Sequence, residues 1–284
     1  MDKILVAIDF SESSQNTLDH AADVAKALNA NLVMLWIKNS KSISHLGISK
    51  NDDIHKAVED SFNAFVDSVS STLNRERIET IIKEGDSSAT ITKVAKELNV
   101  KMIIIGTHGA HGYKKYLMGS NANKVLATAP CPVITILPNR DIGRGLDVIV
   151  VPIDSGVDTR QKLPLATLMA RKFNAEIHIL GLYFSNIETI RRRVDSYSDQ
   201  AHAYVIKQGV KNVVLHKTYS KDGARTIINY AKKVNAGLIA VMIDAELGGS
   251  SWSFGSQAKQ FVNQSPIPIL NVVNKELIRT APKM

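Results

Sequence analysis

Short apolar runs rich in valine and isoleucine alternate along the chain with longer segments in which apolar residues recur every three to four positions. In the first half the short runs predict strands near residues 3–8, 31–37, 78–83, 101–105 and 133–137, with helices between them. Apolar runs of this kind are typical of a parallel sheet that helices cover on both faces. The pattern therefore predicts an α/β fold.

The first helix has a predicted start and a predicted apolar face. Ser11 is the expected N-cap, because its hydroxyl can accept a hydrogen bond from an amide of the first turn. The face that should pack on the sheet consists of Leu18, Ala21, Ala22, Ala25 and Leu28. Near the end of the first half, Pro130 and Pro132 stand where a helix must end and an extended segment must begin.

The chain also repeats itself. KILVAIDFS, which contains Asp9, matches VIVVPIDS at an offset of 145 residues, and the pair Asn-Ala at 29–30 recurs at 174–175 with the same offset. Later in each half the offset is 136, since the pair Gly-Ser at 119–120 recurs at 255–256. The sequence therefore predicts two copies of one small domain.

A linker separates the two copies. Residues 138–147 (PNRDIGRGLD) combine proline, glycine and charges without periodicity. We therefore expect a first domain at 1–140 and a second at 146–276. Both are of ordinary size, since single domains usually contain about 100–200 residues.

Composition narrows the class of protein. The single cysteine, Cys131, excludes a disulfide within the chain and a thiolate metal cluster. The opening MDKILVAIDF is unlike a secretory signal, and no apolar run approaches the roughly 20 residues that span a bilayer. These features predict a soluble, cytoplasmic protein without a membrane partner.

The net charge of +8 lies almost entirely in the second half. Residues 1–140 contain 16 basic and 15 acidic side chains, and the remainder contains 19 and 12. The run Arg191–Arg193 is either a solvated helix face or a contact for an anionic partner. The run lacks interleaved aromatic residues, which favours the solvated face over a nucleic-acid partner.

The candidate chemistry follows the fourth predicted strand. There Gly106, Gly109 and Gly119 form the pattern G-x2-G-x9-G-[ST], and Ser120 opens a helix. Amides at a helix N-terminus are unpaired and carry the positive end of the helix dipole, so a glycine-rich turn there can wrap a phosphate chain. Ligands of open α/β sheets bind at strand ends where the strand order reverses, which would bring Asp9 beside this loop.

The glycine loop together with Asp9 resembles the universal stress protein family, and the resemblance extends over both halves. It implies two tandem Rossmann-like domains, of the adenine nucleotide alpha hydrolase-like class, each with a five-stranded parallel sheet of order 3-2-1-4-5 flanked by helices. It implies a stress-response regulator that binds ATP or AMP, with or without Mg²⁺, rather than an enzyme. It also implies pairing of two domains along their fifth strands.

Position by position, the resemblance assigns roles to residues of the first half. It implies Asp9 for the ribose or the metal-phosphate side, Ala7 and Ile8 for the adenosine wall, and the backbone of Ile37 for the adenine. The implied phosphate cradle consists of Gly106, Gly109, Gly119, Ser120 and Asn121. His108 lies in the loop and is either a phosphate contact or a surface histidine.

The second half departs from the pattern. Residues 242–245 (MIDA) stand where the first half has 106–109 (GTHG). Methionine and alanine cannot replace glycine where left-handed torsions are needed, and Asp244 would repel a phosphate. Asp154 persists, either in an altered site or as a helix-capping residue. We expect no tight ATP site in this half.

Two alternative functions are a slow ATP hydrolase and a nucleotide-independent scaffold for an unknown protein partner. The sequence has no GxxxxGK[ST], HxGH or SGGxDS motif, which disfavours rapid phosphoryl or nucleotidyl transfer. A pure scaffold has no physical reason to keep three glycines in one loop. The apolar runs 133–137 and 269–273 are edge candidates, so we expect an intramolecular pseudo-dimer, with or without a further homodimer.

Overall fold

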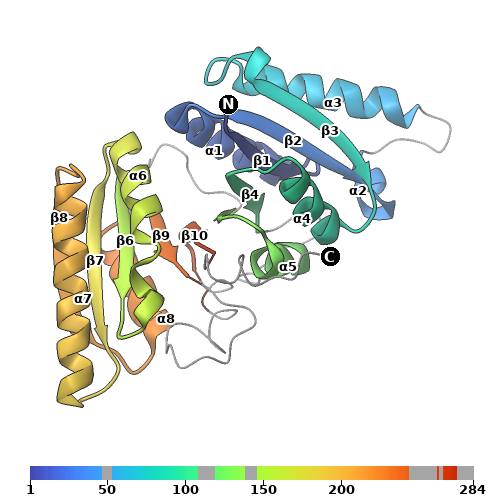
Figure 1. Cartoon of the computed structure of the whole chain (residues 1–284). Helices are drawn as coiled ribbons and strands as arrows, with labels where there is room; N and C mark the ends of the chain where they lie inside the picture. The colour runs from blue at the N-terminus through green and yellow to red at the C-terminus, as the bar shows by residue number, and fades with distance from the viewer. Residues whose placement is uncertain (47–52, 108–118, 138–145, 243–260, 262–264, 274–284) are drawn as a thin grey trace. The chain divides into compact units, whose positions relative to one another are not determined.

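The computed structural model divides into two compact units, Met1–Ile142 and Gly143–Met284 (Figure 1). It describes residues 1–46, 53–107, 119–137, 146–242, 261 and 265–273. Most of the predicted linker, at 138–145, lies outside the described residues. The predicted pairing of the two halves stays a prediction.

The first unit contains the strands that the hydrophobic pattern predicts, to within one residue at each end. They are β1 (Lys3–Ile8), β2 (Asn31–Lys38), β3 (Ile78–Glu84), β4 (Met102–Gly106) and β5 (Val133–Ile136). The helices are α1 (Glu12–Leu28), α2 (Ser40–His45), α3 (Ile54–Val69), α4 (Ser87–Glu97) and α5 (Ser120–Thr128), with a 3-10 helix η1 at Arg75–Arg77. The strands run parallel in the order β3-β2-β1-β4-β5.

The second unit repeats this arrangement. Its strands are β6 (Val148–Ile153), β7 (Glu176–Tyr183), β8 (Val213–Tyr219), β9 (Leu238–Val241) and β10 (Ile269–Asn271). Its helices are α6 (Leu163–Phe173), α7 (Glu188–Lys207) and α8 (Gly223–Lys233), with a 3-10 helix η3 at Val157–Arg160. The parallel order β8-β7-β6-β9-β10 is again 3-2-1-4-5. The predicted fold class is confirmed in both units.

The repeat extends to the residues that end the helices. Asn29 after α1 and Asn174 after α6 both have a φ of 52°, in the left-handed region. Asn99 after α4 and Asn235 after α8 adopt the same conformation, at 48° and 52°. Asparagine enters this region more readily than most residues with a side chain, and its backbone there stops a helix.

The cores lie between the sheets and their helices. The strands β1, β2 and β4, and in the second unit β6, β7 and β9, are buried along nearly their whole length, which explains their largely apolar sequences. The edge strands β3 and β8 are half-buried to exposed. Of the predicted α1 face, the buried members are Leu18, Ala21, Ala22 and Ala25. Among the described residues, no helix is long and apolar enough to cross a membrane.

Candidate functional site

Several strand ends of the first unit meet at one edge of its sheet. β1 lies between β2 and β4, and Ala7 pairs with Leu35 on one side and with Ile105 on the other. The chain leaves β1 toward β2 and leaves β4 toward β5, so the strand order reverses here, which is where open α/β sheets bind ligands. The predicted residues that come together at this edge are Ala7, Ile8, Asp9, Ile37 and Gly106.

Asp9 is held at the N-terminus of α1. Its Oδ1 accepts hydrogen bonds from the hydroxyls of Ser11 and Ser14, each at 2.5 Å, and from the amide of Ser11 at 3.1 Å. Ser11 is also the predicted N-cap, since its Oγ accepts a hydrogen bond from the amide of Ser14 at 3.2 Å. These donors fix a half-buried carboxylate near the positive end of the helix dipole.

The turn after Asp9 is strained. Phe10 has a φ of 60°, which residues with a side chain rarely adopt. Its ring stacks on Trp36 at a centroid distance of 6.0 Å and meets Phe62 and Phe65 of α3 edge-on at 5.1 and 5.3 Å. These contacts offset a conformation that costs about 1–3 kcal/mol. The aromatic cluster therefore fixes the direction in which the chain leaves Asp9.

The start of α5 supplies the second half of the site. Gly119 is its N-cap and has no side chain with which to accept hydrogen bonds from the first-turn amides. The Gly119 amide donates to the carbonyl oxygen of Thr107 at 2.7 Å, and a Cβ on Gly119 would lie 3.1 Å from that oxygen. Ser120 and Asn121 follow and are exposed. Gly109 of the predicted cradle and His108, for which two interpretations were open, lie outside the described residues.

The counterpart of Asp9 in the second unit is Asp154, which follows β6 and is 4% exposed. Its Oδ1 accepts a hydrogen bond from the amide of Gly156 at 2.8 Å, and its own amide donates to Thr159 Oγ1 at 3.1 Å. The N-cap of η3 is Gly156 and that of α6 is Lys162, so Asp154 does not cap the helix that follows. Of the segment that replaces the glycine loop, residues 243–245 lie outside the described residues.

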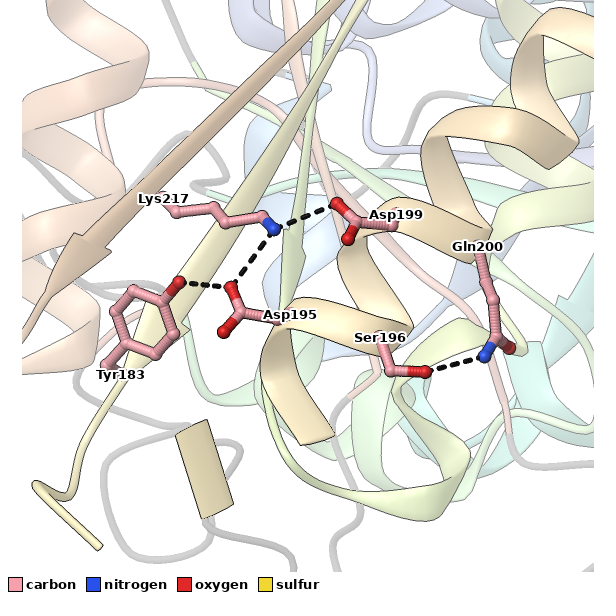
Figure 2. Close-up of polar contacts among 6 residues, drawn as sticks. All are labelled: Tyr183, Asp195, Ser196, Asp199, Gln200 and Lys217. Atoms are coloured by element: carbon pink, nitrogen blue, oxygen red, sulfur yellow. Dashed lines mark hydrogen bonds and ion pairs between the residues drawn. The ribbon is translucent and has the colours of Figure 1, made fainter. Parts of the chain in front are cut away.

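A polar cluster attaches α7 to the edge strand β8 (Figure 2). The Tyr183 hydroxyl donates to Asp195 Oδ1 at 2.5 Å, and Lys217 Nζ donates to Asp195 at 3.0 Å and to Asp199 at 2.8 Å. Burial and the hydrogen bond to Asp195 raise the pKa of the Tyr183 phenol to about 12, and the same hydrogen bond lowers the pKa of Asp195. The phenol therefore keeps its proton, and the cluster serves to hold the helix on the sheet.

This cluster depends on a glycine in β7. A Cβ on Gly181 would lie 2.7 Å from Ser198 Oγ and 3.1 Å from Lys217 Cγ. We expect Gly181→Ala to lower the free energy of unfolding of the second unit by about 1–3 kcal/mol, because overpacking forces these side chains apart. Thermal unfolding followed by circular dichroism measures the loss. Adding Ser198→Ala should recover part of it, and an unchanged transition in Gly181→Ala would contradict the prediction.

The arginine run has aromatic neighbours that its sequence does not show. The Arg191 guanidinium lies 5.7 Å from the Tyr183 ring centroid and 5.5 Å from that of Tyr219. The next residue, Arg192, pairs with Glu188 one turn earlier on α7 at 2.5 Å. Two of the three arginines thus have partners within their own unit.

The fold and the strand-end geometry define a tandem Rossmann-like α/β protein, and comparison with known proteins gives the family. The universal stress protein family matches residues 1–136 and again residues 145–272. The chain therefore belongs to the universal stress protein family and contains two copies of its domain.

Relatives of single-domain length align with about half of the chain. Universal stress protein A homolog 1 of Coxiella burnetii (strain RSA 493 / Nine Mile phase I) is 33% identical over 138 residues, which are 47% of this chain and 94% of the relative. Universal stress protein YxiE of Bacillus subtilis (strain 168) is 28% identical over 145 residues, which are 48% of this chain and 98% of the relative.

Solved structures resemble the whole chain. A universal stress protein from Archaeoglobus fulgidus DSM 4304 aligns with a TM-score of 0.67 and 20% identity over 95% of this chain and 98% of the other. A putative universal stress protein from Pseudomonas aeruginosa UCBPP-PA14 aligns with a TM-score of 0.70 and 18% identity over 98% and 95%. At these identities the similarity establishes the fold.

Proposed function

We propose that this protein binds one adenine nucleotide, ATP or AMP, in its first unit and acts as a cytoplasmic regulator in the stress response. One observation carries the proposal: a fixed carboxylate, Asp9, and the glycine-capped N-terminus of α5 follow the two strands between which the strand order reverses. A carboxylate can accept hydrogen bonds from ribose hydroxyls, and helix N-terminal amides suit phosphate oxygens.

Different residues of the first unit are proposed to contact the adenosine and the phosphates. Ala7 and Ile8 line the adenosine, and the backbone of Ile37 meets the adenine. Gly106, Gly109 and Gly119 let the backbone approach the phosphates, while Ser120 and Asn121 donate hydrogen bonds to them. His108 keeps both of its sequence interpretations, as a phosphate contact or as a surface histidine.

A divalent cation such as Mg²⁺ fits the same donor set. Phosphate oxygens and one carboxylate are the ligands with which Mg²⁺ is usually held, and Asp9 supplies such a carboxylate. Among the described residues no group of three or more His, Cys, Asp or Glu side chains could hold a metal by itself. A cation at this site would therefore arrive with the nucleotide and screen its phosphate charge.

The alternatives, a slow ATP hydrolase and a scaffold without nucleotide, predict different chemistry. Burial raises the pKa of the Cys131 thiol to about 12, so this thiol is not a nucleophile at neutral pH. A scaffold that binds no nucleotide does not need a helix N-terminus that lacks a capping side chain, as α5 has at Gly119. We therefore place nucleotide binding ahead of both.

The test is calorimetric titration of the full chain with ATP and with AMP, in the presence and absence of Mg²⁺. We expect binding near one nucleotide per chain. In Gly119→Ala the added methyl group lies close to the Thr107 carbonyl oxygen, and we expect an affinity at least about tenfold lower, a loss of about 1.4 kcal/mol. Chromatography of the purified protein shows whether it retains a nucleotide. No binding and no retained nucleotide would overturn the proposal in favour of the scaffold.

A further inference from the structure

The second unit buries a lysine beside its counterpart of Asp9. Lys162 is only 4% exposed, whereas lysine is almost never fully buried without a partner. It stands 145 positions after Thr17, a buried residue of α1, so the two positions correspond in the repeat. The second unit has thus placed a positive charge where the first has a neutral hydroxyl.

The surroundings of the two aspartates show what this exchange does. In both units the aspartate amide donates to the hydroxyl five residues later, at 2.9 Å from Asp9 to Ser14 and at 3.1 Å from Asp154 to Thr159. The backbone frame of the turn is therefore kept. The donors to the carboxylates differ, because Gly156 stands where the first unit has Ser11 and cannot donate from a side chain.

The ammonium of Lys162 contacts the same turn. Lys162 Nζ donates to Thr159 Oγ1 at 3.3 Å, the oxygen that also accepts from the Asp154 amide. Burial lowers the pKa of Lys162 to about 8, and the negative charge of Asp154 acts in the opposite direction. Thr159 Oγ1 thus links the Asp154 amide to the Lys162 ammonium, and the two buried side chains carry opposite charges within one unit.

We propose that Lys162 is the internal counter-ion of Asp154 and that it withdraws this carboxylate from ligand binding, so that the chain binds nucleotide in its first unit alone. The part of this inference that concerns the number of nucleotides bound rests on the proposed function. The part that pairs Lys162 with Asp154 does not. A carboxylate that is 4% exposed and compensated by a lysine does not present its oxygens to a ribose or a cation. Lys162 in place of Thr17 and Gly156 in place of Ser11 give the two aspartates different charged and hydrogen-bonding neighbours.

The first test uses Lys162→Met and Asp154→Asn, singly and together, with Lys172→Met on the exposed side of α6 as the matched control. Hydrogen exchange of β6 and β7 amides reports the stability of the second unit, and peptides of β1 and β2 are the internal reference. In the native background Lys162→Met should change protection little, because relief from burying the ammonium is offset by the loss of the counter-charge of Asp154. In the Asp154→Asn background the same change should raise protection, because it removes an uncompensated ammonium. Equal effects in both backgrounds would overturn the charge pair.

The second test is the number of ATP molecules bound per chain, measured by calorimetry. Asp154→Asn, Lys162→Met and Lys172→Met should all retain the native number and an affinity within about twofold of it. If Lys162 or Asp154 instead held a second nucleotide, Lys162→Met or Asp154→Asn would lower the number bound, and the inference would be wrong. If the native chain binds no nucleotide at all, the proposed function fails, while the exchange measurement still decides whether Lys162 and Asp154 are coupled.

Discussion

An Asp9→Asn variant is expected to bind ATP about 10- to 100-fold more weakly than the native chain. Asparagine has nearly the same shape as aspartate and can still accept hydrogen bonds from Ser11 and Ser14, so the turn should persist. It lacks the negative charge that a ribose hydroxyl or a cation would contact. A hydrogen bond to a charged group contributes about 1.5–3 kcal/mol, which corresponds to this range of affinity.

Calorimetric titration of both proteins with ATP in the presence of Mg²⁺ measures the difference. Asp2→Asn, an exposed position before β1, is the matched control and should bind as the native chain does. Circular dichroism must show that Asp9→Asn keeps its fold. A variant with native affinity would mean that the ligand does not contact this carboxylate, and the proposed position of the nucleotide would be wrong.

Much of this fold could be predicted from the sequence, because buried parallel strands have a strong signal. The run from Met102 to Ile105 is apolar at every position, since β4 is buried on both faces, and such a run predicts a buried strand. A helix boundary could be predicted where a residue caps the helix through a local hydrogen bond, as Ser11 does at the start of α1. The strand order came from the resemblance to a family, since periodicity does not encode which strands are neighbours.

The candidate site was only partly predictable. Asp9 and Gly119 could be found because motif spacing places them at a strand end and at a helix start. The role of Phe10 could not, because its backbone angle depends on Trp36 and on α3, which are distant in sequence. Lys162 was missed for a related reason: a lysine near a helix start usually lies in solvent, and only packing shows that this one is buried.

The two units thus share a backbone frame and differ in the electrostatics of one strand end. In the first unit, hydroxyls and an amide hold a half-buried carboxylate near a glycine-capped helix. In the second, a buried lysine and the amide of a buried aspartate share the hydroxyl of Thr159. A duplicated domain can keep its fold while one copy loses ligand contacts, because the sheet core and the helix ends do not depend on them.

A pH effect that raises stability should arise from Lys162, whose pKa of about 8 in the folded chain lies below the value of 10.5 for an unperturbed lysine. Between these values the unfolded chain binds a proton that the folded chain has released, so stability rises with pH. Below about pH 8 the full cost of burying the ammonium is present. The lysine should therefore make the native chain more stable by about 3 kcal/mol as the pH rises from below 8 to above 10.5.

This effect is isolated by comparing the native chain with Lys162→Met. Ionisation of the Cys131 thiol above about pH 9 and of the Tyr183 phenol above about pH 10 acts in the opposite direction, because the folded chain raises the pKa of each group to about 12. Both groups affect the two proteins equally. In urea denaturation followed by circular dichroism, the midpoint of the native chain should rise relative to that of Lys162→Met between about pH 7 and about pH 10. A difference that stays constant over this range would mean that Lys162 keeps the proton affinity of a solvated lysine. The ammonium would then reach water in the folded chain, and Asp154 would lack the buried counter-charge on which the asymmetry between the two units depends.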